Sequence, residues 1–315
     1  MAEVILFGEP LTLFASEHVS DLQHADLFRK FLAGAEVNVS IGLTRLGHPV
    51  SYVTKLGNDP FGHFIADKLA KEGIGTQNAT FDDAHLTGFQ IKSRVENGDP
   101  DIFYFRKNSA ASTLSPEDID QVDFAGVRHV HLTGIAPALS DSCRAAAQRL
   151  IVRARENGAT VSFDPNLRPS LWKDEGTMVR TLNAFAAQSD IVLPGIGEGK
   201  ILTGFEDPAQ IAAFYRSAGA KCVIIKMGGQ GAYVSEGTRA FTVPGFKVER
   251  IVDTVGAGDG FSVGVISARL EGKSFEEAVR RGNAIGAMQI AVQGDNEGLP
   301  TPAQLEAFYA AHQGQ

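Results

Sequence analysis

Short apolar runs recur along the chain and alternate with longer segments of helical periodicity. The apolar runs predict strands at residues 4–7, 50–54, 127–132, 160–163, 191–193 and 222–226. The segments between them predict helices, among them one that begins near Gly34 and closes at Gly47, and one over residues 140–156. Strands that alternate with helices in this way form a mostly parallel sheet with helices on both faces. The pattern therefore predicts an α/β fold.

Residues 76–108 interrupt this alternation. Apolar and polar side chains alternate over residues 89–95, residues 96–99 predict a turn, and residues 102–106 predict a returning strand. This pattern indicates an antiparallel hairpin. Residues 11–33 can pair with it in a small sheet outside the main one. We interpret the segments 11–33 and 76–108 as a lid over a site, and as a surface through which the protein forms a homo-oligomer.

The glycine-rich stretch at residues 252–261 is the most informative local signal. A strand is predicted before it, at residues 247–252, and a helix after it, so residues 256–258 lie at a strand-to-helix turn. Unpaired N–H groups at a helix N-terminus and the helix dipole both favour a bound anion. Asp259 is then either a helix-start residue or a base that takes the proton of a hydroxyl while the amides hold the charge on a transferring phosphoryl group.

Three further polar positions carry two interpretations each. Asn38, in the first turn of a predicted helix, is either an amide that binds a ligand or a solvated helix-start residue. Residues 164–168, Asp-Pro-Asn-Leu-Arg, follow a strand at the edge where open α/β sheets bind ligands, and they also have the composition of a polar turn. The glycine turn at residues 227–231 either lies against a nucleotide or closes a hairpin.

The composition narrows the class of protein. No apolar run approaches the ~20 residues of a membrane span, and the N-terminus lacks the basic region and cleavage site of a signal peptide. A net charge of −8 without a basic tract argues against nucleic acid as a partner. The two cysteines, Cys143 and Cys222, indicate a reducing compartment and no disulfide framework. We therefore expect a cytoplasmic protein that binds neither membranes nor nucleic acid.

Two other motifs carry little weight. Residues 260–264 match the pattern Gly-x-Ser-x-Gly, but the turn precedes them, which leaves Ser262 inside a helix and not at the tip of a nucleophile elbow. His129 and His131 can share one face of a strand, as two metal ligands would. No third ligand is spaced near them, so structural histidines are the preferred interpretation.

Four segments carry a resemblance to a known family. They are 33–38 (Ala-Gly-Ala-Glu-Val-Asn), 45–47 (Arg-Leu-Gly), 57–62 (Gly-Asn-Asp-Pro-Phe-Gly) and 253–261 (Asp-Thr-Val-Gly-Ala-Gly-Asp-Gly-Phe). With them the chain resembles, over its full length, the ribokinase-like (PfkB-type) carbohydrate kinases. Within that family, residues 8–10, 163–168 and 294–300 look most like the kinases of 2-keto-3-deoxygluconate.

The resemblance implies a single kinase domain over residues 1–315, with a three-layer α/β/α Rossmann-like core and a small β-sheet lid. It implies ATP as the phosphoryl donor, Mg²⁺ as a cofactor and a monovalent cation as a further candidate. Asp259 would deprotonate the 6-hydroxyl of 2-dehydro-3-deoxy-D-gluconate, and an anion hole would be formed by the amides of Gly256, Ala257 and Gly258. By the same resemblance, the sugar acid would be held by Gly34, Asn38, Phe89, Tyr104, Arg106, Arg168 and Asp295. The nucleotide would lie near Asn166, Lys226, Gly228, Gly229, Gly231, Gly256, Gly258 and Asn283. Glu198 would act in the metal shell through water.

Two departures from the family pattern bear on these expectations. Many members carry Asn three residues before the metal-shell glutamate, where this chain has Gly195, which weakens the role of Glu198. Fructokinase-like members carry an acidic residue soon after the first strand, whereas residues 11–13 are Leu-Thr-Leu here, which disfavours a neutral hexose. The alternatives are a PfkB-type kinase for a neutral ketose or a related keto acid, and a non-catalytic sugar sensor. The presence of Asp259 in its glycine turn disfavours the sensor, because sensing needs no base.

Overall fold

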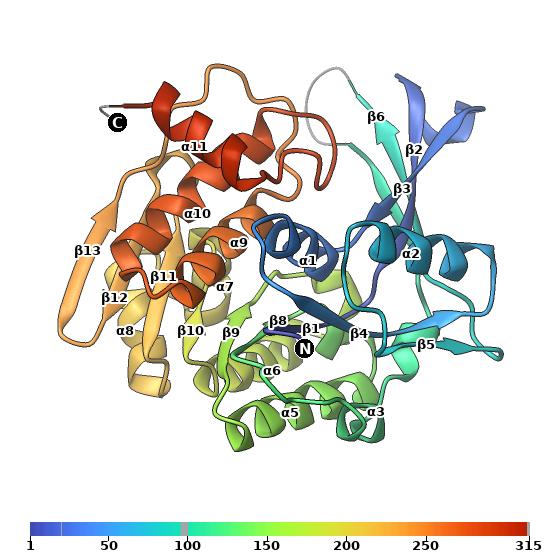
Figure 1. The fold of residues 1–315 in the computed structure, drawn as a ribbon, viewed down its shortest axis with the longest axis horizontal. Coiled ribbons are helices and arrows are strands. Elements are labelled where there is room, and N and C mark those ends of the chain that lie inside the picture. Colours follow the sequence, from blue (N-terminus) through green and yellow to red (C-terminus); the bar gives the residue numbers. More distant parts are fainter. Residues whose placement is uncertain (20, 96–99, 314–315) are drawn as a thin grey trace.

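The computed structural model describes residues 1–19, 21–95 and 100–313. Within them lie a nine-stranded sheet of order β13-β12-β11-β10-β9-β8-β1-β4-β5 and a four-stranded sheet of order β3-β2-β6-β7 (Figure 1). The strands of the large sheet are β1 (Val4–Phe7), β4 (Val50–Gly57), β5 (Ala79–Asp82), β8 (His129–Thr133), β9 (Thr160–Asp164), β10 (Ile191–Val192), β11 (Cys222–Lys226), β12 (Ala232–Glu236) and β13 (Arg239–Val243). Neighbouring strands from β5 through β11 pair in parallel, and β12 and β13 add an antiparallel hairpin at one edge. The predicted α/β fold is confirmed.

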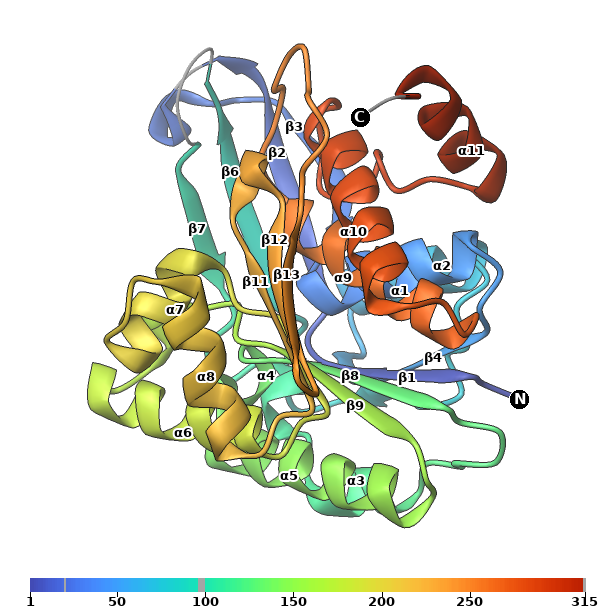
Figure 2. The same cartoon turned by 90° about the vertical axis from the view of Figure 1, so that its left-hand side faces the viewer.

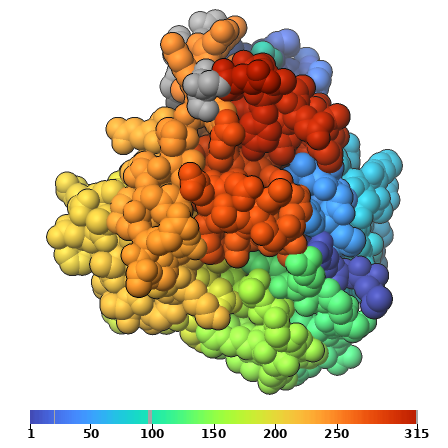
Figure 3. Space-filling view, turned by 60° about the vertical axis from the view of Figure 1, so that its left-hand side comes forward, coloured from blue at the N-terminus to red at the C-terminus, as the bar shows by residue number. Residues whose placement is uncertain are grey.

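Helices cover both faces of the large sheet (Figure 2). One face carries α3 (Pro116–Asp120), α4 (Ala136–Leu139), α5 (Asp141–Glu156), α6 (Glu175–Ala187), α7 (Ile196–Thr203) and α8 (Pro208–Ala218). The other carries α1 (Ala35–Arg45), α2 (Pro60–Lys71), α9 (Ala257–Leu270), α10 (Phe275–Ile290) and α11 (Pro302–Ala311). In the space-filling view the C-terminal helices, orange to red, fill the middle and top of one side of the molecule (Figure 3).

The two faces of the sheet bury separate cores because side chains alternate along each strand. In β1, Ile5 and Phe7 belong to the core under α5 and α6, whereas Val4 and Leu6 belong to the core under α1 and α9. Both faces are therefore dry, which explains why the strands of this sheet read as continuous apolar runs.

The small sheet is the predicted lid. It consists of β2 (Leu11–Val19), β3 (Phe28–Ala33), β6 (Phe89–Arg94) and β7 (Ile102–Phe105). β2 pairs with β3 antiparallel and with β6 in parallel, and β6 pairs with β7 antiparallel, which confirms the hairpin and its pairing with residues 11–33. The predicted turn at residues 96–99 lies outside the described residues.

Two sequence-based expectations are wrong. The range 76–108 is too wide for the lid, because β5 pairs with β4 in the large sheet. Residues 247–252 are not a strand but an extended loop, and Ile251 and Val252 in it are exposed. β13 is followed by Pro244, which has no N–H to continue a strand ladder, so the chain leaves the sheet before the glycine turn.

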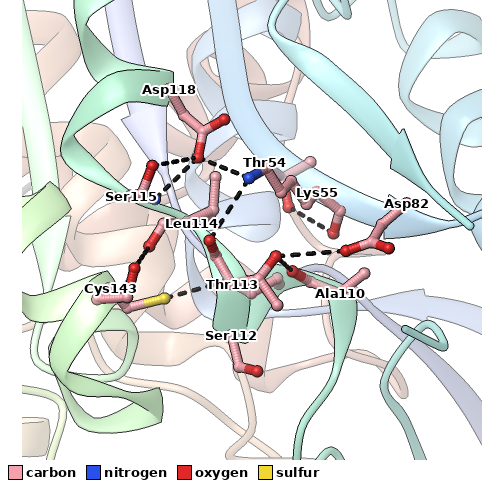
Figure 4. A network of polar contacts seen from close by, with 12 residues as sticks. Thr54, Lys55, Asp82, Ala110, Ser112, Thr113, Leu114, Ser115, Asp118 and Cys143 are labelled. Atoms are coloured by element: carbon pink, nitrogen blue, oxygen red, sulfur yellow. Dashed lines mark hydrogen bonds and ion pairs between the residues drawn. The ribbon is translucent and has the colours of Figure 1, made fainter. Parts of the chain in front are cut away.

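The segment that returns from the lid to the core is anchored by a polar network (Figure 4). It includes the 3₁₀ helix η2 (Ala110–Thr113), which follows β7. Lys55 on β4 contacts Asp118 at 2.8 Å, and Thr113 donates to the carboxylate of Asp82 at 3.4 Å. The thiol of Cys143 on α5 donates to the carbonyl of Ala111 at 3.1 Å. One end of the lid is thereby fixed to β4, β5 and α5.

No helix in the described ranges is long and apolar enough to cross a membrane. The predicted helix over residues 140–156 is confirmed as α5, whose first turn is capped by Ser140, and α10 begins with a capping box formed by Ser274 and Glu277.

Candidate active site

A cavity of about 630 Å³ lies between the lid and the carboxyl ends of the central strands. Open α/β sheets bind ligands at this edge, because the loops after the parallel strands diverge there. The lid contributes Leu11, Gln90, Lys92, Ile102, Tyr104 and Arg106 to the lining. The core contributes Glu9, Gly34, Ala35, Glu36, Asn38, Ile135, Asp164, Asn166, Arg168, Glu198, Lys226, Thr254, Val255, Gly256, Gly258, Asp259 and Asp295.

Asp259 lies in the first turn of α9 and is held by two side-chain amides. Asn38 of α1 donates through Nδ2 to Oδ2 of Asp259 at 2.8 Å, and Asn166, after β9, donates through Nδ2 to Oδ1 at 3.4 Å. Asn166 has a φ of 40°, in the left-handed region, and its N–H donates to the carboxylate of Asp164 at 3.2 Å. The carboxylate of Asp259 is therefore oriented by elements that are distant in the sequence.

The pKa of Asp259 is raised from 3.8 to about 7. Burial is the main cause, and the charge of Asp164 acts in the same direction; the hydrogen bond from Asn38 and the charges of Lys226 and Arg168 oppose it. A carboxylate that titrates near neutral pH is suited to general base catalysis, because it is both deprotonated and basic at the working pH.

The turn before Asp259 can be built only with glycine at position 256. Gly256 has a φ of +78°, and a Cβ there would lie 2.3 Å from the carbonyl oxygen of Asp295. The first N–H groups of α9 have no acceptors within the helix, so residues 256–258 present amides at its N-terminus. Lys226 lies near the turn, since a Cβ on Gly258 would be 3.5 Å from its ammonium nitrogen. This arrangement can hold an anion next to Asp259.

Lys226 is itself positioned by Asp164, whose carboxylate lies 2.6 Å from its Nζ. Burial lowers the pKa of Lys226, but the attraction of Asp164, Glu198 and Asp259 outweighs burial and raises it. The ammonium group therefore stays charged near the glycine turn.

The cavity contains two arginines in different electrostatic settings. Arg106 is buried and bound to Glu9, with Nε donating to Oε2 at 2.6 Å, and Ser109 donates to the same carboxylate. Arg168 donates through Nη1 to the carbonyl of Leu167 at 2.9 Å. Within the described ranges Arg168 forms no ion pair with an acidic side chain, so its charge is available to a ligand.

Glu9 is a residue that the sequence analysis missed. It follows β1 and is 2% exposed, so an acidic group does face the cavity after the first strand, contrary to the expectation drawn from residues 11–13. Its ion pair with Arg106 neutralises it. The signal available in the sequence was the Glu between Gly8 and Pro10 at the end of a buried strand.

Gln90 and Lys92 are two further cavity residues that were not predicted from the sequence, whereas their neighbour Phe89 was predicted to hold the sugar acid. Gln90 and Lys92 line the cavity together with their cross-strand partners Tyr104 and Ile102. Phe89 lies on the opposite face of the lid, where its ring stacks on Phe105 at 4.6 Å. Since side chains alternate along β6, a contact of Phe89 with the substrate is not supported.

The remaining predicted residues fall into two groups. Glu198 lines the cavity and accepts the N–H groups of Leu167 and Gly195 at 2.8 and 2.7 Å. Asn283 binds the carbonyls of Val243 and Pro244 at 3.2 and 2.9 Å, so it fixes the loop after β13 and is not part of the described lining.

The glycines at positions 228, 229 and 231 close the hairpin between β11 and β12. Gly231 has a φ of +92°, and a Cβ there would lie 2.0 Å from the carbonyl oxygen of Val243. The hairpin interpretation of this turn is confirmed, and its contact with a nucleotide stays a prediction.

The structure also shows the positions of Ser262 and of the histidine pair, the two motifs that carry little weight in the sequence. Ser262 lies inside α9, where its hydroxyl donates to the carbonyl of Gly258 at 3.1 Å. His129 and His131 flank Ser162, each with a ring nitrogen 2.7 Å from its hydroxyl oxygen. Burial lowers the pKa of both histidines to about 3. The described residues contain no group of three or more His, Cys, Asp or Glu side chains that could hold a metal ion.

The chain belongs to the pfkB family of carbohydrate kinases, whose model matches residues 1–302. It is 46% identical over 310 residues to the 2-dehydro-3-deoxygluconokinase of Bacillus subtilis (strain 168), an alignment that covers 98% of this chain and 96% of the relative.

Solved structures share the fold. A PfkB protein from Polaromonas sp. JS666 superposes with a TM-score of 0.90 at 44% identity, over 98% of this chain and 100% of the other. A ribokinase II from E. coli, solved in complex with ATP and Mg²⁺, gives a TM-score of 0.90 at 28% identity, over 99% of this chain and 100% of the other. These likenesses confirm the ribokinase-like architecture.

Proposed function

We propose that this protein is an ATP-dependent sugar-acid kinase that phosphorylates the 6-hydroxyl of 2-dehydro-3-deoxy-D-gluconate. The kinase class follows from the family. The substrate is supported by the Bacillus subtilis relative and, independently, by the charges of the cavity. ATP and Mg²⁺ are supported by the E. coli structure that contains both.

The observation that carries the substrate assignment is that Arg168 has no ion-pair partner among the described residues. It lines the same cavity as Asp259, and its charge acts on that carboxylate only from beyond ion-pair distance. A guanidinium group binds a carboxylate with two parallel hydrogen bonds and binds a neutral hydroxyl less well. The C1 carboxylate of the sugar acid is the group that would complete this site. Arg106, already paired with Glu9, would contribute hydrogen bonds more than net charge.

The reaction follows from the orientation of Asp259. Its carboxylate would accept the proton of the sugar's 6-hydroxyl as the oxygen attacks the γ-phosphorus of ATP and ADP leaves. Asn38 and Asn166 hold the carboxylate in place, which preserves the direction of proton transfer. The amides of residues 256–258 and the ammonium of Lys226 would stabilise the charge that moves onto the phosphoryl oxygens.

The residues near the turn fit Mg²⁺ bound mainly through phosphates and water. Mg²⁺ keeps several waters and takes one or two carboxylates with substrate phosphates. Asp164 and Glu198 both line the cavity, and each is already fixed, by Lys226 and by two main-chain N–H groups respectively. They would therefore hold the ion through water. The ion would neutralise phosphate charge and orient the triphosphate.

A kinase for a neutral ketose is the second candidate, because Glu9 could accept a sugar hydroxyl. Its ion pair with Arg106 and its hydrogen bond from Ser109 occupy it, which favours the acid. A non-catalytic sensor is disfavoured by the presence of Asp259 in the cavity directly after the glycine turn, because sensing needs no base at that place.

The substrate assignment can be tested with two matched sugars, the sugar acid and 3-deoxy-D-fructose. They differ only at C1, which is a carboxylate in the acid and a hydroxymethyl group in the neutral sugar. Wild type should show a much higher kcat/KM for the acid. Arg168→Ala should reduce kcat/KM for the acid by ~30- to 5000-fold, the equivalent of ~2–5 kcal/mol for a buried charge pair, with little change for the neutral sugar.

Arg168→Lys should recover part of the loss, because one ammonium cannot reproduce a two-pronged contact. Arg180→Ala on the exposed side of α6 is the matched control and should behave as wild type. Equal kcat/KM values of wild type for both sugars would refute the acid assignment. Arg106→Ala is a poorer test, because it leaves Glu9 buried without its counter-charge.

We also propose that the protein is a cytoplasmic homo-oligomer that associates through the lid. The lid face turned away from the cavity exposes Phe103 and Phe105, which remain 59% and 51% accessible on the edge strand β7. Exposed aromatic side chains on a sheet edge favour association with another copy. Cys143 and Cys222 are both free and buried, in keeping with a reducing compartment.

A further inference from the structure

Lys92 extends from the lid strand β6 into the core of the protein. Its ammonium nitrogen lies 3.1 Å from a carboxylate oxygen of Asp253 and 3.5 Å from one of Asp295. All three side chains are nearly buried, with exposed fractions of 11% for Lys92, 13% for Asp253 and 8% for Asp295. The lid and the core thus meet in a three-charge cluster, in which neither Lys92 nor Asp253 has a role in the chemistry described above.

Both carboxylates belong to segments that shape the anion-binding turn. The second carboxylate oxygen of Asp253 accepts the N–H of Val255 at 3.1 Å. The main-chain carbonyl of Asp295 packs against Gly256 so closely that a Cβ would not fit. The turn is further tied to the segment of Asp295 by Gln289, whose Nε2 donates to the carbonyls of Val255 and Gly294 at 3.3 and 2.7 Å.

The cluster depends on its single positive charge. Burial raises the pKa of Asp295; the charge of Lys92 opposes this, and that of Asp253 adds to it. The ion pair with Lys92 is the one polar contact of Asp295 Oδ1 in the described part of the chain, where this atom has no hydrogen bond. If the ammonium were withdrawn, two buried carboxylates would face each other across the turn, which is electrostatically unfavourable.

We propose that Lys92 is a positioning residue through which the lid holds residues 254–258 in their anion-binding conformation. Because the ammonium comes from the lid, residues 254–258 adopt this conformation only when the lid lies against the core. Phosphoryl transfer is thereby coupled to coverage of the sugar, which limits transfer to water. The inference rests on the kinase activity of the family and holds for whichever sugar the cavity accepts.

Lys92 is not suited to bind the substrate's carboxylate, although it lines the cavity. Two aspartates already outnumber its charge, so a third carboxylate would be repelled by the cluster as a whole. Loss of Lys92 should therefore lower kcat, and it should do so equally for the sugar acid and for 3-deoxy-D-fructose. Loss of Arg168 should instead discriminate between the two sugars.

The test is Lys92→Met, which keeps the length of the side chain and removes its charge. We expect kcat to fall on the order of 10²-fold with either sugar, the size of effect seen when one group that stabilises a transition-state anion is lost. Adding Asp295→Asn to Lys92→Met removes the repulsion and should restore part of kcat, a coupling that a double-mutant cycle measures. Lys92→Arg should retain most of the activity.

Lys30→Met is the matched control, since Lys30 lies on the lid away from the cavity and contacts the ring of Phe64. Thermal unfolding of each variant shows whether it is folded. If Lys92→Met is unstable, the effect of losing Lys92 is measured in the Asp295→Asn background instead. The kcat of Lys92→Met/Asp295→Asn, which lacks the uncompensated charge, is then compared with the kcat of Asp295→Asn alone. An unchanged kcat, or a rise in KM confined to the acid, would overturn the proposal. The preference of wild type between the two sugars decides the proposed substrate separately.

Discussion

The hydrogen bond from Asn38 to Asp259 allows a quantitative test of the proposal that Asp259 is the catalytic base. Asn38→Leu keeps the approximate shape of the side chain and removes the N–H that reaches Oδ2 at 2.8 Å. A hydrogen bond to a charged group contributes ~1.5–3 kcal/mol, and 1.36 kcal/mol corresponds to about one pKa unit. This bond favours the ionised carboxylate, so its loss should raise the pKa of Asp259 by ~1–2 units above its value of about 7.

The assay is the pH dependence of kcat/KM for the sugar acid at saturating ATP, read by ADP release. A base must be deprotonated to act, so wild-type activity should rise with pH through about 7. In Asn38→Leu this rise should move upward by ~1–2 pH units. Well below both midpoints the variant should be slower by ~10- to 100-fold, and above both midpoints the two enzymes should converge, because both carboxylates are then ionised.

Asp259→Asn is the control for this experiment. It keeps the size of the side chain but cannot accept a proton, so kcat should fall by ~10²–10⁴-fold and the rise near neutral pH should disappear. A midpoint that stays the same in Asn38→Leu would refute the argument that this hydrogen bond sets the pKa of the base. A uniform loss of activity at every pH would show instead that Asn38 acts by positioning alone.

Two further predictions concern assembly and acid stability. Phe103→Lys, on the outer face of the lid, should shift the protein to a smaller species in sedimentation velocity. The control is Phe205→Lys, an exposed position after α7 and outside the lid, which should leave the sedimentation coefficient unchanged. An identical sedimentation coefficient for wild type and both variants would exclude the lid interface. The pKa of His129 and His131 is lowered to about 3, so their contribution to stability is complete above the unfolded value of 6.5 and is lost as pH falls toward 3. In that window the free energy of unfolding should fall by up to ~1.4 kcal/mol per pH unit for each histidine, and His131→Gln should remove its share of the slope in urea titrations; an unchanged slope would contradict this.

The arrangement of strands, helices and lid was predictable because it depends on local pattern. Continuous apolar runs such as residues 4–7 indicate strands that are buried on both faces, and alternation over residues 89–95 indicates a strand with one solvated face. The glycine turn at 256–258 was predictable for the same reason, since its conformation is required at those residues themselves. Residues 247–252 were wrongly predicted as a strand because an apolar run can lie in an exposed loop when a proline has already ended the sheet.

The pairing of charged side chains was decided by the tertiary structure. Glu9 meets Arg106 across 97 positions of sequence, and Lys92 meets Asp253 across 161. No sequence periodicity identifies the partner of a carboxylate or an ammonium group, because the interaction depends on the distance between the two groups in space and on their burial. The sequence therefore determined the fold and the glycine turn that precedes Asp259, the proposed base, because these features rest on local conformation. Only the tertiary structure decided which arginine keeps a free charge and which lysine connects the lid to the turn.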